Sequence, residues 1–120
     1  MAVIVIAEDE FLLADMLVSF LEDEGHDVSS APHGVAALEL IRDRPPELII
    51  TDFMMPLMTG LELAQSVRAD PQLSTIPIIL VSGAQGSIGR AHPDAFNFVM
   101  DKPYSLDALL EIVNELLAKR

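Results

Sequence analysis

The sequence contains no cysteine, and only seven of its 120 residues are lysine or arginine. The absence of cysteine excludes disulfides, thiolate catalysis and cysteine-bound zinc. No apolar run reaches the roughly 18–20 residues of a membrane span. The N-terminal run Ala2–Ala7 is too short for a signal-peptide core, has no basic lead and is followed at once by Glu8. We therefore expect a cytoplasmic protein without membrane insertion.

Basic charge is scarce relative to acidic charge. Nineteen acidic residues give the chain a formal net charge of −12. Such a surface repels phosphate backbones, so direct binding of nucleic acid is not expected, whereas basic partner surfaces and divalent cations are favoured. The simpler interpretation of this charge is solubility. The length and the apolar fraction of 51% predict a single folded domain over residues 1–120.

Short apolar runs alternate with longer segments of helical period. The apolar runs predict strands over 3–6, 27–31, 48–51, 76–81 and 96–100. Helical spacing predicts helices over 10–24 and 34–43, a third that Thr59 caps and that runs to Ala69, and a last one capped by Ser105. Pro77 suggests that pairing of the fourth strand starts just after it. Between Ser82 and Pro93 glycines are crowded, so a helix there should be short or frayed.

This alternation is typical of an α/β protein. Five strands and about five helices predict a doubly wound five-stranded parallel sheet of the flavodoxin-like order 2-1-3-4-5, with a weak or irregular fourth helix. In such sheets ligands bind beyond the carboxyl ends of the strands.

Polar side chains follow four of the predicted strands. Glu8, Asp9 and Glu10 follow the first, Asp52 the third, Ser82 the fourth and Lys102 the fifth. Each has an ordinary structural interpretation alone: acids in the first turn of a helix, turn residues, or a solvated lysine. In the order 2-1-3-4-5, however, these strands are contiguous, and all these groups converge on one edge of the sheet.

Carboxylates gathered in one place need a cation. Mg²⁺ prefers oxygen ligands and commonly pairs one or two carboxylates with a phosphate oxygen. Asp9 and Asp52 are candidates for direct ligands, and Glu8 for a ligand through water. Asp52 would then attack a phosphoryl group and form an aspartyl phosphate. Lys102 would contribute positive charge and Ser82 a hydrogen bond to the phosphoryl oxygens.

The run from Asp52 to Pro56, followed by Gly60, resembles the D-x-x-M-P…G signature of response-regulator receiver domains in two-component signalling. Glu8, Asp9, Ser82 and Lys102 fall at the other landmarks of that family. The resemblance implies that Asp52 is the phosphoacceptor and that Glu8, Asp9 and the backbone carbonyl of Met54 bind the metal together with Asp52. It also implies that Ser82 turns toward the phosphate and that Lys102 contacts it.

The resemblance also implies partners. The phosphodonor would be a histidine kinase, a phosphotransfer protein or a small phosphorylated metabolite, and the chain would catalyse only its own phosphorylation and dephosphorylation, not the turnover of a substrate. Three features depart from the family pattern. They are Glu8, where an aspartate is more usual, Val99, where many members have an aromatic switch residue, and the interval from Ser82 to Lys102, which is a little short and rich in glycine. We therefore predict that phosphorylation changes the surface around residues 83–104, which recruits an output protein or a second copy of this chain. Receiver domains often hold the lysine–proline bond cis, and we predict a cis bond at Lys102–Pro103.

Three other functional classes fit these residues less well. A haloacid-dehalogenase-like phosphatase or phosphotransferase would need a general acid two residues after the nucleophile, where this chain has Met54. An unphosphorylated receiver-like interaction module is disfavoured by the retention of Asp52, Asp9 and Lys102. A dinucleotide-binding unit is disfavoured because the first turn, residues 7–10, has no glycine.

Overall fold

The computed structural model describes residues 2–119, so the two end residues of the predicted 1–120 domain lie outside the described part of the chain. The five strands found there are β1 (Val3–Ala7), β2 (Asp27–Ala31), β3 (Leu48–Asp52), β4 (Ile78–Ser82) and β5 (Phe98–Asp101). The five helices are α1 (Phe11–Asp23), α2 (Gly34–Asp43), α3 (Gly60–Ala69), α4 (Gly86–Arg90) and α5 (Leu106–Ala118). The strands are all parallel, in the order β2-β1-β3-β4-β5. The predicted fold class is confirmed.

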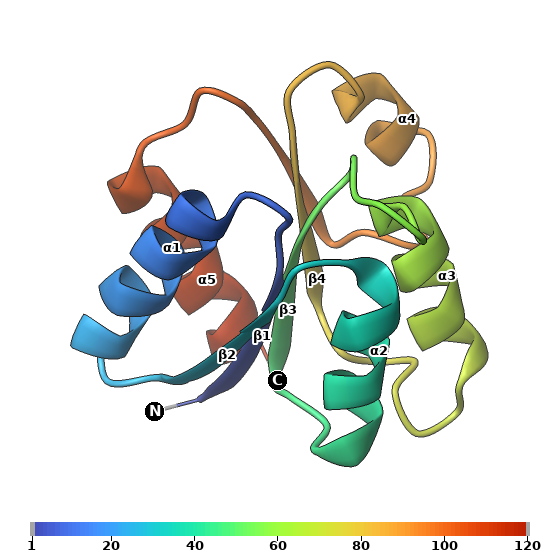
Figure 1. The fold of residues 1–120 in the computed structure, drawn as a ribbon, viewed down its shortest axis with the longest axis horizontal. Helices are drawn as coiled ribbons and strands as arrows, with labels where there is room; N and C mark the ends of the chain where they lie inside the picture. Colours follow the sequence, from blue (N-terminus) through green and yellow to red (C-terminus); the bar gives the residue numbers. More distant parts are fainter. Residues whose placement is uncertain (1, 120) are drawn as a thin grey trace.

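Two apolar cores lie on opposite faces of the sheet. Figure 1 shows helices on both sides of the sheet. Because successive strand residues point to opposite faces, Ile4 and Ile6 pack on one side and Val5 on the other. The first face is covered by α1 and α5, through residues such as Leu17 and Leu109. The second face is covered by α2 and α3. The central strands are buried on both faces, which explains their continuous apolar sequence.

Two helix caps follow the predictions. The Thr59 hydroxyl accepts the backbone N–H of Glu62 at 3.2 Å, and the Glu62 carboxylate accepts the backbone N–H of Thr59 at 2.9 Å. This is the predicted capping box. Ser105 caps α5 by accepting the N–H of Ala108 at 3.0 Å. Both caps therefore fix the start of a helix directly after a loop that follows the carboxyl end of a strand.

Several predicted boundaries are wrong by one or two residues. The first and third strands extend to Ala7 and Asp52, because Ala7 pairs with Thr51 and Asp52 with Val81. The fourth strand begins at Ile78, directly after Pro77 as predicted, and extends to Ser82. The fifth begins at Phe98 rather than residue 96, because Phe96 is buried in the core from a turn before the strand.

Some large apolar residues of α1 and α2 do not face the core. Met16 is 45% exposed and Val35 is 41% exposed. In their place the small residues Ala14 and Ala37 are buried. Helical spacing locates an apolar face only approximately, and here alanines face the strands while larger neighbours lie at the edge.

The fourth helix is short, as the sequence predicts, and spans only Gly86–Arg90. Gly89 is nevertheless required for packing: a Cβ there would collide with the side chain of Leu80 and lie 3.1 Å from Cγ2 of Val99. The glycine thus lets α4 lie directly against β4 and β5.

None of the helices within residues 2–119 is sufficiently long and apolar to serve as a membrane span.

Candidate functional site

Asp52 is the last residue of β3 and ends a strand whose other residues are all buried. Its Oδ1 accepts the backbone N–H of Phe53 at 2.9 Å. Gly60, the first residue of α3, approaches so closely that a Cβ would collide with the Asp52 backbone carbonyl, and its N–H donates to the carbonyl of Phe53 at 2.8 Å. The start of α3 is thereby held against the end of β3, and the Asp52 carboxylate is fixed at the edge of the sheet.

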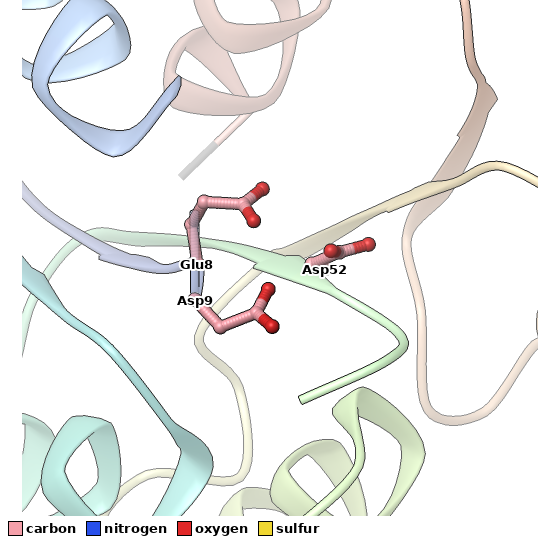
Figure 2. A group of neighbouring side chains, drawn as sticks. All are labelled: Glu8, Asp9 and Asp52. Atoms are coloured by element: carbon pink, nitrogen blue, oxygen red, sulfur yellow. The ribbon is translucent and has the colours of Figure 1, made fainter. Parts of the chain in front are cut away.

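Three carboxylates meet at this edge. Glu8 and Asp9 follow β1, the strand that neighbours β3 in the sheet. Oxygen atoms of Glu8, Asp9 and Asp52 all lie within 4.8 Å of one another. Figure 2 shows the three side chains gathered between the ends of the two strands. Asp9 is exposed, whereas Glu8 is only 4% exposed. The predicted acidic cluster is therefore assembled by the fold.

The environment makes ionisation of Glu8 and Asp52 costly. Burial is the main cause that raises the pKa of Glu8 from 4.5 to about 7, and the charge of Asp52 adds to it. The N–H of Glu10, which donates to Glu8 Oε2 at 3.1 Å, and the charge of Lys102 oppose this shift. Burial also raises the pKa of Asp52, against the opposing charge of Lys102. A nearby cation would stabilise the ionised form of these two carboxylates.

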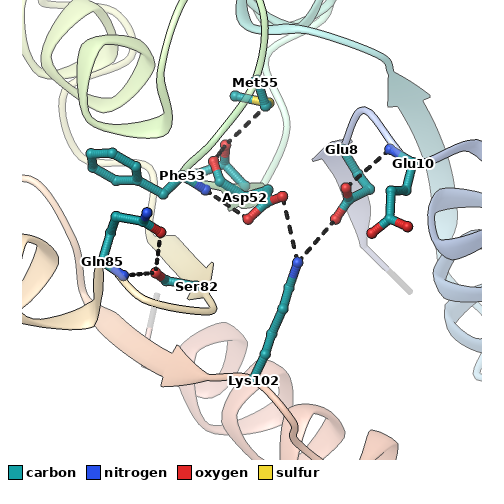
Figure 3. A network of polar contacts seen from close by, with 9 residues as sticks. Glu8, Glu10, Asp52, Phe53, Met55, Ser82, Gln85 and Lys102 are labelled. Carbon is teal, nitrogen blue, oxygen red and sulfur yellow. Dashed lines mark hydrogen bonds and ion pairs between the residues drawn. The ribbon is translucent and has the colours of Figure 1, made fainter.

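Lys102 supplies part of that positive charge. It follows β5, and its Nζ lies 3.5 Å from Asp52 Oδ2 and 3.9 Å from Glu8 Oε1 (Figure 3). Its backbone N–H donates to the carbonyl of Ser82 at 2.7 Å, which joins the ends of β4 and β5. The Lys102–Pro103 peptide bond is cis, as predicted. One ammonium thus faces two carboxylates, and the third acid, Asp9, adds further negative charge.

Ser82 lies at the same edge of the sheet and is completely buried. Its hydroxyl accepts the backbone N–H of Gln85 at 2.9 Å and lies 3.3 Å from the side-chain Oε1 of the same residue, to which it donates. In this structure the hydroxyl is therefore bonded to Gln85 and not to Asp52 (Figure 3). The fold brings Ser82 to the site, but the hydroxyl is turned toward α4.

Met54 stands in the loop after Asp52 and is 58% exposed. The thioether therefore belongs to the surface of the protein, and any contribution of Met54 to a metal site would come from its backbone. The loop after Asp52, residues 53–59, contains no acidic residue.

Two residues near the site were missed by the sequence analysis. Gln85 carries no signal in the sequence, because its role depends on the turn after β4. Tyr104 lies two residues after Lys102, and this short separation could have identified it as a neighbour of the site. Its hydroxyl is buried and has no hydrogen-bond partner within residues 2–119. Burial, assisted by the charges of Glu8 and Asp52, raises the pKa of Tyr104 to about 12.

The donor set fits a hard divalent cation. The clustered ligand atoms are carboxylate oxygens, which Mg²⁺ prefers, and Asp9 is open to solvent, as suits an ion that keeps part of its water shell. The raised pKa values of Glu8 and Asp52 come mainly from burial, and the positive charge of a bound cation would oppose this shift.

Comparison with known proteins gives a consistent match. The response regulator receiver domain family matches residues 4–114. A chemotaxis protein CheY homolog of Campylobacter jejuni is 31% identical over 118 residues, which cover 95% of this chain and 91% of that protein. The probable transcriptional regulator ycf29 of Pyropia yezoensis is 30% identical, over 97% of this chain and 53% of that protein. The chain spans about half the length of the first curated relatives it matches.

Solved structures agree. A response regulator receiver domain from Francisella superimposes with a TM-score of 0.90 at 26% identity, over 99% of this chain and 98% of the other. The signal receiver domain of a histidine kinase from Syntrophus aciditrophicus gives 0.91 at 29% identity, over 99% and 92% of the two chains.

Proposed function

The chain belongs to the response regulator receiver domain family, the signalling modules of two-component systems, and we propose that it works as a switch phosphorylated on Asp52. We propose that the whole chain, residues 1–120, forms this one domain. The observation that carries the proposal is the convergence of three carboxylates and one lysine: Lys102 Nζ lies 3.5 Å from Asp52 Oδ2, inside a cluster whose acids lie within 4.8 Å of one another.

Asp52 would act as the nucleophile. A carboxylate oxygen forms a bond to phosphorus while the bond from phosphorus to the donor atom breaks, and the donor atom leaves with the electron pair. Of the two Asp52 oxygens, Oδ1 is held by the Phe53 N–H and Oδ2 faces Lys102. Lys102 would stabilise the negative charge of the transferred phosphoryl oxygens. The chain thereby contributes positioning and charge, which is most of what phosphoryl transfer needs.

A bound Mg²⁺ would neutralise the acidic cluster and the incoming phosphoryl oxygens. We propose Glu8, Asp9, Asp52 and the backbone carbonyl of Met54 as the residues that hold it. Support comes from the carboxylate cluster and from the raised pKa values of Glu8 and Asp52.

We propose a histidine kinase or a phosphotransfer protein as the phosphodonor, with small phosphorylated metabolites as the alternative. The surface beside the acids supports a protein partner, because Phe11 and Leu12 at the start of α1 are 78% and 80% exposed and Leu57 in the loop after Asp52 is 77% exposed. The net charge of −12 argues against direct binding of this chain to nucleic acid.

The test is phosphorylation by acetyl phosphate with Mg²⁺, followed by intact-protein mass spectrometry. We expect one phosphoryl group on the wild type, no label on Asp52→Asn, and normal labelling of the control Asp94→Asn, whose acid lies on the exposed turn before β5. Circular dichroism would verify that Asp52→Asn folds. Labelling of a folded Asp52→Asn variant at the wild-type level would refute Asp52 as the acceptor.

A further inference from the structure

Both hydrogen bonds of the Ser82 hydroxyl in this structure are made with a single residue, Gln85. It accepts the Gln85 N–H at 2.9 Å and donates to Gln85 Oε1 at 3.3 Å. We propose that Gln85 is a positioning residue that holds Ser82 away from Asp52 in the resting protein and links the release of Ser82 to α4. This inference rests on the proposed phosphorylation of Asp52 and adds the residue that sets its resting state.

The two acceptors compete because a serine hydroxyl has one proton to donate. In the resting structure that proton points to Gln85 Oε1. A phosphoryl group on Asp52 would add strong acceptor oxygens at the same edge of the sheet. Since Ser82 is completely buried, the hydroxyl has no solvent to turn to, and its proton goes either to Gln85 or to the phosphoryl group.

Gln85 also connects this choice to the backbone of α4. It is the residue directly before the helix, and its carbonyl accepts the N–H groups of Ile88 at 3.1 Å and Gly89 at 3.2 Å. Rotation of Ser82 toward Asp52 would break the side-chain bond to Gln85 and weaken the bond from its N–H. The first turn of α4 would thereby lose the contacts that attach it to the end of β4.

The rest of α4 is anchored elsewhere. Arg90 pairs with Asp101 on β5, and Gly89 packs against Leu80 and Val99. Release of Ser82 would therefore act on residues 83–88, between the end of β4 and this anchor. Ile88 lies on this turn and is 40% exposed, so it belongs to the surface that a partner would contact. This coupling from Ser82 through Gln85 to α4 does not require an aromatic residue at position 99, where the chain has Val99.

The test uses Gln85→Met. This substitution keeps a side chain of similar length and the backbone N–H, but it removes the acceptor Oε1. Binding of beryllofluoride with Mg²⁺ is measured on the full chain by the fluorescence of Tyr104, the sole tyrosine in a chain without tryptophan. We expect Gln85→Met to bind about fivefold more tightly than the wild type, the factor that one neutral hydrogen bond is worth. Gln65→Met, on the exposed side of α3, is the matched control and should bind like the wild type.

A cycle with Ser82→Ala separates this role from a general effect on folding. In the Ser82→Ala background the proton is gone, so Gln85→Met should no longer change the affinity. Hydrogen–deuterium exchange of residues 83–88 should rise in resting Gln85→Met and change little further on addition of beryllofluoride. Unchanged affinity of Gln85→Met, or equal tightening with and without the Ser82 hydroxyl, would overturn the role of Gln85 while leaving Asp52 as the acceptor. If the wild type binds no beryllofluoride, the proposed function fails, and this inference fails with it.

Discussion

Arg90 and Asp101 form a two-pronged ion pair between α4 and the end of β5. The Arg90 Nη2 lies 2.6 Å from Asp101 Oδ2, and Nη1 lies 3.3 Å from Oδ1. Asp101 directly precedes Lys102, so the pair attaches the short helix to the strand end that presents the lysine to Asp52. The geometry is favourable, but both side chains are about half exposed, and solvent weakens such a pair.

Arg90→Met should therefore loosen α4 without unfolding the domain. We expect faster amide exchange of residues 86–91 and nearly unchanged thermal stability, because the pair is a local anchor of a five-residue helix. The control is Arg44→Met. It removes the exposed ion pair with Asp27 on β2, the edge strand opposite β5. Unchanged exchange in α4 would show that packing around Gly89 alone holds the helix.

Mg²⁺ should stabilise the folded protein. A cation relieves the repulsion among Glu8, Asp9 and Asp52 only in the folded state, where these acids are brought together. Millimolar Mg²⁺ is expected to raise the melting temperature of the wild type. Asp9→Asn should abolish this increase and should itself stabilise the metal-free protein, because it removes one of the three charges. A wild-type melting temperature insensitive to Mg²⁺ would contradict the proposed metal site.

Glu8 should make the metal-free protein less stable as the pH rises. Its folded-state pKa of about 7 lies above its ordinary value of 4.5, so the folded state binds the proton more tightly than the unfolded state. The stabilisation is complete below about pH 4.5 and is lost as the pH rises through 7. The shift corresponds to roughly 3 kcal/mol.

The measurement is the difference in unfolding free energy between Glu8→Gln and the wild type from pH 4 to 8, by urea denaturation without metal. The advantage of the glutamine variant should grow with pH over this window. Glu39→Gln, on the exposed side of α2, is the matched control. A constant difference between Glu8→Gln and the wild type would mean that Glu8 ionises normally in the folded protein.

Arg68 should be a major contributor to stability at the amino-terminal ends of β4 and β5, away from the site. Its guanidinium donates to four backbone carbonyls and to the Asn97 side chain, joining α3 to the segments before β4 and β5. Arg68→Met removes the Arg68 donor from all five acceptors, although Asn97 Oδ1 keeps the backbone N–H of Ile78 at 2.8 Å. We expect a loss of roughly 2–4 kcal/mol in the free energy of unfolding. Arg42→Met, which breaks only a 3.8 Å surface pair, should cost far less. Equal losses in the two variants would contradict this role of Arg68.

The sequence alone determined the sheet and the position of the site. A continuously apolar strand such as 3–6 is typical of burial on both faces, and the connections between parallel strands leave few strand orders. Because functional groups of such sheets gather beyond the carboxyl ends of the strands, the convergence of Asp52, Glu8, Asp9, Ser82 and Lys102 could be predicted before any coordinates. The capping box at Thr59 could also be predicted, since it depends only on residues three apart.

The tertiary structure decided what depends on distance and burial. The 4% exposure of Glu8, which raises its pKa, results from packing that no local pattern specifies. The bonds from Ser82 to Gln85 depend on the path of the turn after β4, and the close contact of Gly89 with Leu80 shows that a glycine can permit packing where its sequence context suggests only helix breaking. Spacing along a chain fixes which residues share an edge of a sheet. Which hydroxyl faces which acceptor at that edge is set by side-chain packing between segments distant in sequence, and this only the folded structure contains.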